Sequence, residues 1–144
     1  MNYLPTVINI ETVNRYCNAR CPMCTIKFSP EYSNVSKDEF SHNGILRKAE
    51  IMTLDNFKII IDKFKSIAGN ITALNLHGCG EPLLDKSLAD KVKYAKISGF
   101  TNVGFSSNCD ILTRETTESL LDSGLNCLIA SIDGLSKDVQ EKIR

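Results

Sequence analysis

A strand-like run, Thr6-Val-Ile-Asn-Ile-Glu-Thr-Val13, leads into a cysteine loop, Cys17-Asn-Ala-Arg-Cys21-Pro-Met-Cys24. The run is apolar and β-branched, which predicts a first strand. The loop has the spacing Cys-x3-Cys-x2-Cys. Thiolates are the usual ligands of iron–sulfur clusters, and three of them can hold three corners of a four-iron cluster. The fourth iron would then lack a protein ligand and be open to a small molecule, so the loop indicates chemistry more than scaffolding.

The composition is that of an ordinary globular domain. The chain has 144 residues, 42% of them hydrophobic, and its 17 Lys and Arg balance 17 Asp and Glu. This length is enough for one domain with its own core. A net charge of zero argues against broad electrostatic binding of nucleic acid. No apolar run approaches the ~18 residues of a membrane span. We therefore expect neither a nucleic-acid nor a membrane partner.

The cysteine count bears on the cellular compartment. An even number, here six, would suggest disulfides in a secreted domain. However, three of the cysteines are crowded together in the loop, and the N-terminal residues lack the basic and apolar segments of a signal peptide. A cytoplasmic location with free or metal-bound thiols is therefore expected.

Strand-like and helix-like segments alternate along the rest of the chain. The polar stretch 27–50 is interpreted as a long functional or mobile excursion. Thr53, Thr113 and Ser136 are expected to cap the N-termini of helices, because their side chains can accept a hydrogen bond from a first-turn N–H. The further expected strands are 71–76, 101–106 and 126–131, and the expected helices are 53–70, 86–98, 113–123 and 136–144.

These strand–helix units, the last incomplete, predict an α/β fold with a parallel sheet and right-handed crossovers. The strands are apolar runs, as expected when both faces of a sheet are covered. Polar motifs follow each strand, and ligands of parallel α/β folds bind at that edge. We therefore predict one site built from the cysteine loop, His77-Gly-Cys-Gly-Glu-Pro82, Ser106-Ser-Asn108 and Ser131-Ile-Asp-Gly134.

The motifs, in this order, resemble those of the radical SAM superfamily over nearly the whole chain. The resemblance implies a partial (β/α) TIM-type barrel, about four βα units of a six-unit core. It also implies that Cys17, Cys21 and Cys24 hold a [4Fe–4S] cluster. S-adenosylmethionine would bind the open iron through its amino and carboxylate groups. Reductive cleavage would then give a 5′-deoxyadenosyl radical that abstracts hydrogen from a substrate.

The same resemblance implies which residues bind S-adenosylmethionine. Met23 matches the family's apolar position beside the adenine, and Glu81 with nearby backbone carbonyls suits the methionine ammonium. Gly78 and Gly80 lack a Cβ, so the backbone can approach a ligand closely there, and Pro82 would make the turn rigid. The groups assigned to the carboxylate and the ribose are Ser107, Asn108, Ser131 and Asp133.

Family membership would further imply an electron donor such as a flavodoxin or ferredoxin, and a substrate, either a peptide or a small molecule, that the residues do not specify. An eight-unit barrel runs to ~250 residues, so six units need roughly 190. Residues 1–144 are thus expected to be the N-terminal portion of the core domain, truncated within the fourth helix. We expect a fragment or one half of a split oxidoreductase or maturase, with strand 126–131 as an exposed edge. Segment 51–57 loosely resembles members with a C-terminal auxiliary-cluster domain.

Plainer interpretations of the cysteine loop stay open. Cys21 and Cys24 alone could form a redox dithiol. A structural zinc site would need a fourth ligand, for which His42 or His77 could serve. The chain could therefore also be a non-catalytic iron–sulfur or electron-transfer module, or a zinc-stabilised interaction domain.

Other residues near the motifs receive simpler expectations. Cys127 lies in an apolar strand and is expected in the core. Cys79 and Cys109 are expected to be small rim residues, with an auxiliary ligand or a reactive thiol as the alternative. Cys109 stands where the family often has Gly. His77 is expected to be a hydrogen-bonded rim residue, with proton transfer as the alternative. Arg144 is expected to be a surface charge.

Overall fold

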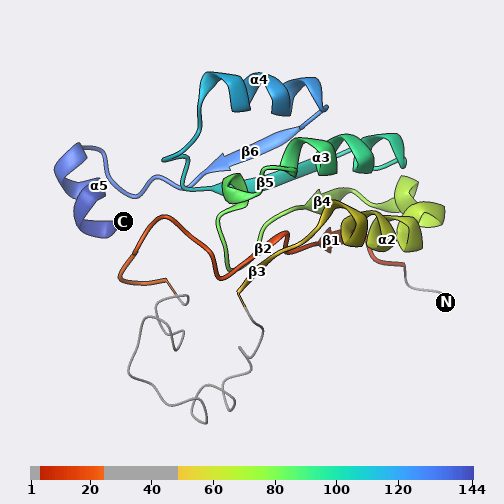
Figure 1. Ribbon diagram of the computed structural model, residues 1–144, viewed down its shortest axis with the longest axis horizontal. Coiled ribbons are helices and arrows are strands. Elements are labelled where there is room, and N and C mark those ends of the chain that lie inside the picture. Colours follow the sequence, from red (N-terminus) through yellow and green to blue (C-terminus); the bar gives the residue numbers. More distant parts are fainter. Residues whose placement is uncertain (1–3, 25–48) are drawn as a thin grey trace, which may run out of the picture.

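The computed structural model describes residues 4–24 and 49–144. Its main sheet is parallel, with the strand order β1-β4-β5-β6 (Figure 1). The α/β class and the parallel sheet predicted from the sequence are therefore confirmed. Most of the stretch 27–50, together with His42, lies outside the described residues. The strands of this sheet are β1 (Val7–Asn9), β4 (Ala73–Asn75), β5 (Val103–Ser107) and β6 (Cys127–Ala130).

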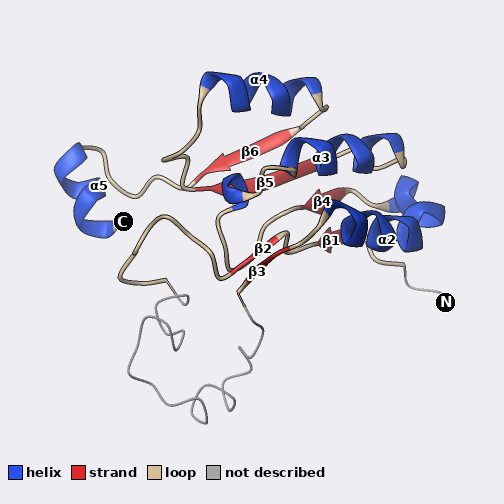
Figure 2. Cartoon of the chain, viewed as in Figure 1, coloured by secondary structure: helices blue, strands red, loops and turns tan. Residues whose placement is uncertain are grey.

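Three helices lie side by side along one face of the sheet (Figure 2). They are α2 (Leu54–Phe64), α3 (Leu88–Ile97) and α4 (Arg114–Asp122), and a short helix, α5 (Lys137–Ile143), follows β6. The predicted N-caps are confirmed, because Thr53, Thr113 and Ser136 each accept a hydrogen bond from a first-turn N–H. Caps of this kind satisfy backbone donors that the helix itself leaves unpaired.

Two of the expected elements are each divided into two in the structure. The helix expected to reach residue 70 ends as α2 at Phe64 and continues as a 3-10 helix, η2 (Lys65–Asn70). The first expected strand divides into β1 and β2 (Val13–Asn14), and β2 pairs antiparallel with β3 (Glu50–Ile51). The strand divides because the chain leaves the main sheet after residue 10 to meet a partner far away in sequence.

The core lies between the sheet and its three helices. Leu74 and Phe105 point from the strands toward Phe57 and Ile61 of α2 and Val92 of α3, and all five side chains are buried. Burying side chains of this size contributes about 1.5–3 kcal/mol each. Phe57 and Ile61 are four residues apart and therefore lie on the same face of α2, which is the face that packs on the sheet.

Among residues 4–24 and 49–144, no helix covers the opposite face of the sheet, which corrects the expectation that both faces are covered. Val7 is 49% exposed and Ile129 is 55% exposed. Cys127 is also exposed, so the prediction that it packs in the core is wrong. The reason is that β6 is an edge strand, as predicted, and the described part of the sheet does not close on itself.

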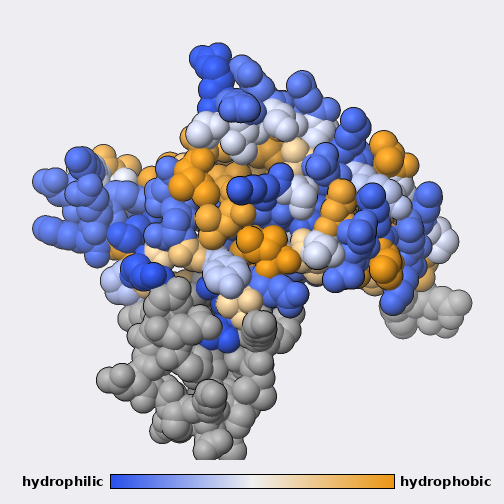
Figure 3. All heavy atoms as spheres, viewed as in Figure 1, coloured by the Kyte–Doolittle hydropathy of each residue, from blue (hydrophilic) through white to orange (hydrophobic). Residues whose placement is uncertain are grey.

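The outer surface of the helical layer is mainly hydrophilic. Figure 3 shows hydrophilic residues over α4 and α5, with hydrophobic residues gathered in the central part of the same view. Across residues 4–24 and 49–144, no helix combines the length and the apolar character needed to cross a membrane.

Candidate functional site

The cysteine loop follows β2 and lies at the carboxyl edge of the main sheet. None of the chain's six cysteines forms a disulfide. Cys21 is buried, whereas Cys17 and Cys24 are half-buried. A turn closes the loop, because the Cys24 N–H donates to the Cys21 carbonyl at 3.0 Å. The backbone N–H of Ala19 donates to the Cys17 sulfur at 3.4 Å. The loop therefore presents free thiols with a backbone donor already directed at one sulfur.

Burial raises the pKa of the Cys17 thiol. The Ala19 N–H donor acts in the opposite direction, and the nearby Glu81, Cys24 and Cys21 raise the pKa further. Negative charges crowded near the Cys17 sulfur disfavour its thiolate, so burial and charge both favour the protonated thiol. A metal centre that binds this loop must therefore displace that proton.

Glu81 connects three of the four motifs. Its side chain is buried, with Oε1 accepting from the Ser107 hydroxyl at 2.7 Å and from the Leu83 N–H at 3.0 Å. Its Oε2 accepts from the Asn108 N–H at 2.9 Å. Its own N–H donates to the carbonyl of Tyr16, next to the first cysteine, at 2.8 Å. The carboxylate thus has a structural role, and its predicted contact with an ammonium group stays a prediction. Pro82, also buried, begins the 3-10 helix η3 (Pro82–Leu84) directly after it.

The atoms that come closest to Gly78 and Gly80 belong to Glu11 and Val13 of the same chain. A Cβ on Gly78 would lie 2.6 Å from a carboxylate oxygen of Glu11, and one on Gly80 would overlap the Val13 carbonyl oxygen. Between them, Cys79 donates its N–H to Glu11 and accepts at its carbonyl from the Arg15 N–H. The glycines are therefore needed to seat this turn against the segment leading into the cysteine loop, whether or not a ligand also approaches them.

Replacing Gly80 by alanine is expected to destabilise the fold by about 1–3 kcal/mol, as overpacking typically does. The added methyl group meets backbone at Val13, which cannot move aside as a flexible side chain can. The matched control is Gly69→Ala, where a Cβ meets nothing within 4 Å. Urea unfolding of both variants measures the difference. Equal midpoints for the two variants would contradict the packing described for Gly80.

Asn108 reaches from the end of β5 to the cysteine loop. Its Nδ2 lies 3.7 Å from the Cys17 sulfur and 3.0 Å from the Asn18 side-chain oxygen. The next residue, Cys109, has a φ of 62°, a left-handed conformation that glycine adopts without strain. This explains why glycine would suit that position, and the Cys109 N–H is held by the Ser107 hydroxyl at 2.9 Å.

The strand-four motif reaches the site through Arg144. Asp133 accepts from an Arg144 nitrogen at 2.6 Å, and another Arg144 nitrogen lies 3.7 Å from the Cys21 sulfur. The Arg144 side chain is only 17% exposed, so the expectation of a surface charge is wrong. Ser131 is half-buried and donates its backbone N–H to Ser107. Met23, by contrast, is 58% exposed at the tip of the loop.

His77 closes the hydrogen-bond ladder between β4 and β5. Its Nδ1 accepts from the Ser106 N–H at 3.2 Å, where a backbone carbonyl would be the usual partner. This contact favours the interpretation of a hydrogen-bonded rim histidine over one of proton transfer.

The spacing of the candidate ligands bears on the kind of metal centre that they could bind. Within the two described ranges, no three or more His, Cys, Asp or Glu side chains lie close enough to hold one metal ion. Tetrahedral zinc needs its ligands about 2.0–2.3 Å from one centre. A four-iron cluster is larger, and each thiolate binds a separate iron. Three free thiols spaced through one loop are a donor set of the kind that such a cluster takes.

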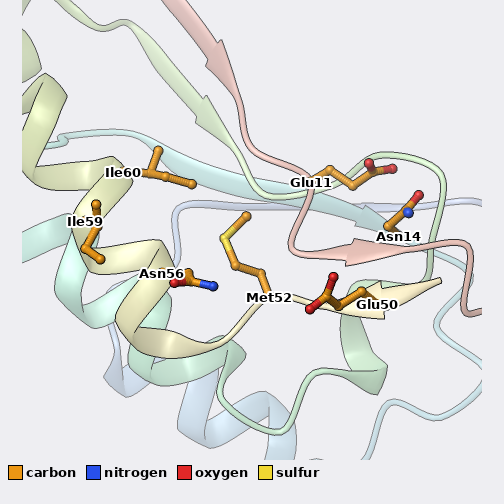
Figure 4. Close-up of a pocket in the computed structure, with 7 residues that line it drawn as sticks. All are labelled: Glu11, Asn14, Glu50, Met52, Asn56, Ile59 and Ile60. Atoms are coloured by element: carbon orange, nitrogen blue, oxygen red, sulfur yellow. The ribbon is translucent and has the colours of Figure 1, made fainter. Parts of the chain in front are cut away.

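A pocket of about 480 Å³ lies beside the site (Figure 4). It is lined by Glu11 in the β1–β2 connection, by the β2–β3 pair and by α2. None of the predicted site residues lines it, although Glu11 connects it to the turn at Cys79. Its lining residues are Glu11, Asn14, Glu50, Met52, Asn56, Ile59 and Ile60.

Sequence reasoning missed three residues that organise the site. Glu11 holds the turn at Cys79, Asn18 anchors Asn108, and Arg144 joins Asp133 to Cys21. Glu11 could have been noticed in the sequence, because it is an acidic residue inside an apolar strand-like run. Asn18 and Arg144 carry no such signal, because their partners are distant in sequence.

Comparison with known proteins places these motifs in a family context. A family model described as the Radical SAM superfamily matches residues 12–144. The chain is 29% identical over 123 residues to GTP 3′,8-cyclase of Clostridium perfringens (strain SM101 / Type A), covering 85% of the chain and 33% of that relative. It is 26% identical over 132 residues to Fe-coproporphyrin III synthase of Methanosarcina barkeri (strain Fusaro / DSM 804), covering 92% and 28%. The chain thus spans about a third or less of these curated relatives.

A solved structure shares the fold. The crystal structure of BtrN in complex with AdoMet and 2-DOIA superposes with a TM-score of 0.70 at 21% identity, over 100% of this chain and 54% of BtrN. A second structure of BtrN, in an open conformation, gives a TM-score of 0.67. The likeness confirms the predicted partial TIM-type fold.

Proposed function

The chain belongs to the radical SAM superfamily, and we propose that it forms the cofactor-binding part of a radical SAM enzyme. Members of the superfamily use a [4Fe–4S] cluster and S-adenosylmethionine, which confirms the two cofactors predicted from the sequence. Bound together, they would supply the cleavage of S-adenosylmethionine by one electron from the reduced cluster. The products would be methionine and a 5′-deoxyadenosyl radical that removes a hydrogen atom from a substrate. We assign Cys17, Cys21 and Cys24 as the cluster ligands.

One observation carries this proposal: hydrogen bonds tie all four strand-end motifs together around three free cysteines. Glu81 joins the second and third motifs, Asn108 joins the third to Cys17, and Arg144 joins the fourth to Cys21. Donors are directed at two of the three sulfurs, as suits thiolates that carry negative charge. The donor set therefore fits a cluster with three protein ligands.

The protein's own part is to bind, orient and shield. Cys21 is buried, so its side chain is shielded from solvent. Met23, exposed at the loop tip, is available to pack on an adenine ring. Ser131 and Asp133 stand on the same rim, where hydroxyl and carboxylate groups suit the polar parts of S-adenosylmethionine. The turn from Gly78 to Pro82 stays our assignment for the methionine ammonium, through its backbone carbonyls.

Residues 1–144 do not specify the substrate of the enzyme. The two relatives are named for different reactions, and BtrN was crystallised with a further compound, 2-DOIA. We propose that residues 1–144 are the N-terminal portion of the core domain and that substrate contacts come from further strands or domains. An oxidoreductase or maturase acting on a peptide or small molecule, reduced by a flavodoxin or ferredoxin, fits this part.

The proposal is tested by anaerobic reconstitution of the chain with iron and sulfide, followed by addition of S-adenosylmethionine. We expect a brown protein whose reduced EPR spectrum changes on adding the cofactor, because the sulfonium compound binds the open iron. Little 5′-deoxyadenosine is expected from these residues by themselves, because we assign to them only the N-terminal portion of the core domain. Cys127→Ala changes an exposed cysteine of the edge strand and should behave like the wild type, which checks that the iron binds at the loop cysteines.

Two results would count against this function. An iron centre whose spectrum is indifferent to S-adenosylmethionine would favour the electron-transfer module. A colourless protein with bound zinc would favour the interaction domain.

A further inference from the structure

We infer that Asn108 is a positioning residue that holds Cys17 and tunes the bound cluster through an N–H···S hydrogen bond. This inference rests on the proposed function and extends it to a residue whose expected role was to bind S-adenosylmethionine. The Asn108 side chain is buried, and its Nδ2 lies 3.7 Å from the Cys17 sulfur. A sulfur acceptor is large, so this separation is within hydrogen-bonding range.

The orientation of the Asn108 amide follows from its other contacts. Its Oδ1 accepts from the Asp110 N–H at 3.0 Å, which leaves Nδ2 to face the cysteine loop. The second Nδ2 hydrogen is directed at the Asn18 side-chain oxygen at 3.0 Å. An amide whose oxygen is held by a backbone donor has one favourable orientation. The contact with Cys17 is therefore set by the hydrogen-bond network.

The backbone of Asn108 is fixed as firmly as its side chain. Its N–H donates to the buried Glu81 carboxylate at 2.9 Å, and that carboxylate also binds the Ser107 hydroxyl. The donor is thus built into the end of β5 before any cluster binds. It needs little reorganisation when the Cys17 thiol becomes a thiolate.

An N–H donor at a cluster sulfur favours the more negative, reduced state of the cluster. Hydrogen bonds to the sulfurs are among the terms that set the reduction potential of an iron–sulfur centre. Groups that orient metal ligands are typically worth roughly 10–100-fold in metal affinity. Loss of the Asn108 amide should therefore lower both the potential of the cluster and its retention.

The test compares Asn108→Asp with Asn102→Asp in the anaerobically reconstituted chain. Both asparagines flank β5, and the Asn102 amide donates to the Thr72 carbonyl at the opposite end of the strand. Asn108→Asp replaces the donor with an anionic acceptor facing Cys17. We expect a more negative midpoint potential, measured by redox titration followed by EPR, and roughly 10-fold weaker iron retention. Asn102→Asp should match the wild type in both measurements.

Asn108→Ala removes the donor without adding a charge, which covers the case in which Asn108→Asp does not fold. A smaller shift in the same direction is expected, and Asn18→Ala should give a partial shift by loosening the amide. Wild-type potentials in Asn108→Ala and in any folded Asn108→Asp protein would overturn the inference while leaving the proposed function standing. A wild-type chain that takes up no iron would overturn both.

Discussion

Replacing Cys21 by alanine is expected to leave the chain unable to retain an iron–sulfur cluster. Cys21 is the central cysteine of the loop and the most buried of the three. Without it, only two thiolates remain for a cluster that already has one iron without a protein ligand. Iron and sulfide analysis after anaerobic reconstitution should fall from about four irons per chain to less than about one.

Other cysteines of this chain serve as matched controls for that loss. Cys127→Ala changes an exposed residue of the edge strand and should retain the wild-type iron content. The iron content of Cys79→Ala and of Cys109→Ala shows whether either rim cysteine is a cluster ligand. Full cluster content in Cys21→Ala would contradict the assignment of Cys21 as a cluster ligand. Loss of iron in Cys79→Ala alone would indicate that the cluster binds at the second motif.

Replacing Lys91 by methionine is expected to destabilise the fold by about 3–5 kcal/mol, the usual cost of leaving a buried charge unpaired. Lys91 lies in α3 with its side chain fully buried, and its Nζ contacts the Asp85 carboxylate and the Met52 carbonyl. Asp85 is also almost fully buried and accepts from the Ser87 N–H at 2.9 Å. Removal of the ammonium leaves this carboxylate with no opposite charge.

Urea unfolding at neutral pH measures the loss. Lys93→Met on the same helix is the control, because Lys93 is exposed and surface changes usually stay within about 0.5 kcal/mol. The double variant Lys91→Met with Asp85→Asn should recover part of the stability, since no charge is then left unpaired. If Lys91→Met unfolds at the same urea concentration as Lys93→Met, the ion pair carries no net stability.

Local patterns were sufficient for three of the helix starts and for the parallel arrangement of the strands. Thr53, Thr113 and Ser136 act as caps because a side-chain oxygen three residues before a free N–H reaches it within one turn. The carboxyl ends of parallel strands share one edge, so the order of motifs along the chain already predicted that they meet. The structure joins them through Glu81 and Asn108.

Other features depended on partners that the local pattern does not specify. Cys127 and Ile129 are apolar, yet they are exposed because nothing in the described sheet covers that face. Gly78 and Gly80 suggested room for a ligand, whereas the neighbours are Glu11 and Val13. In each case the residue type was compatible with the predicted environment, and the environment itself depended on which elements pack nearby.

The sequence by itself determined the class of the protein: a cysteine trio after the first strand, polar turns after the next three, and a periodicity that alternates between strand and helix. Each of these depends on spacing within about ten residues, where chain geometry leaves few choices. Only the tertiary structure decided which side chains face the sulfurs. Asn108 meets Cys17 across 91 positions and Arg144 meets Cys21 across 123. Contacts at such separations arise from packing of the whole sheet, and no local preference encodes them.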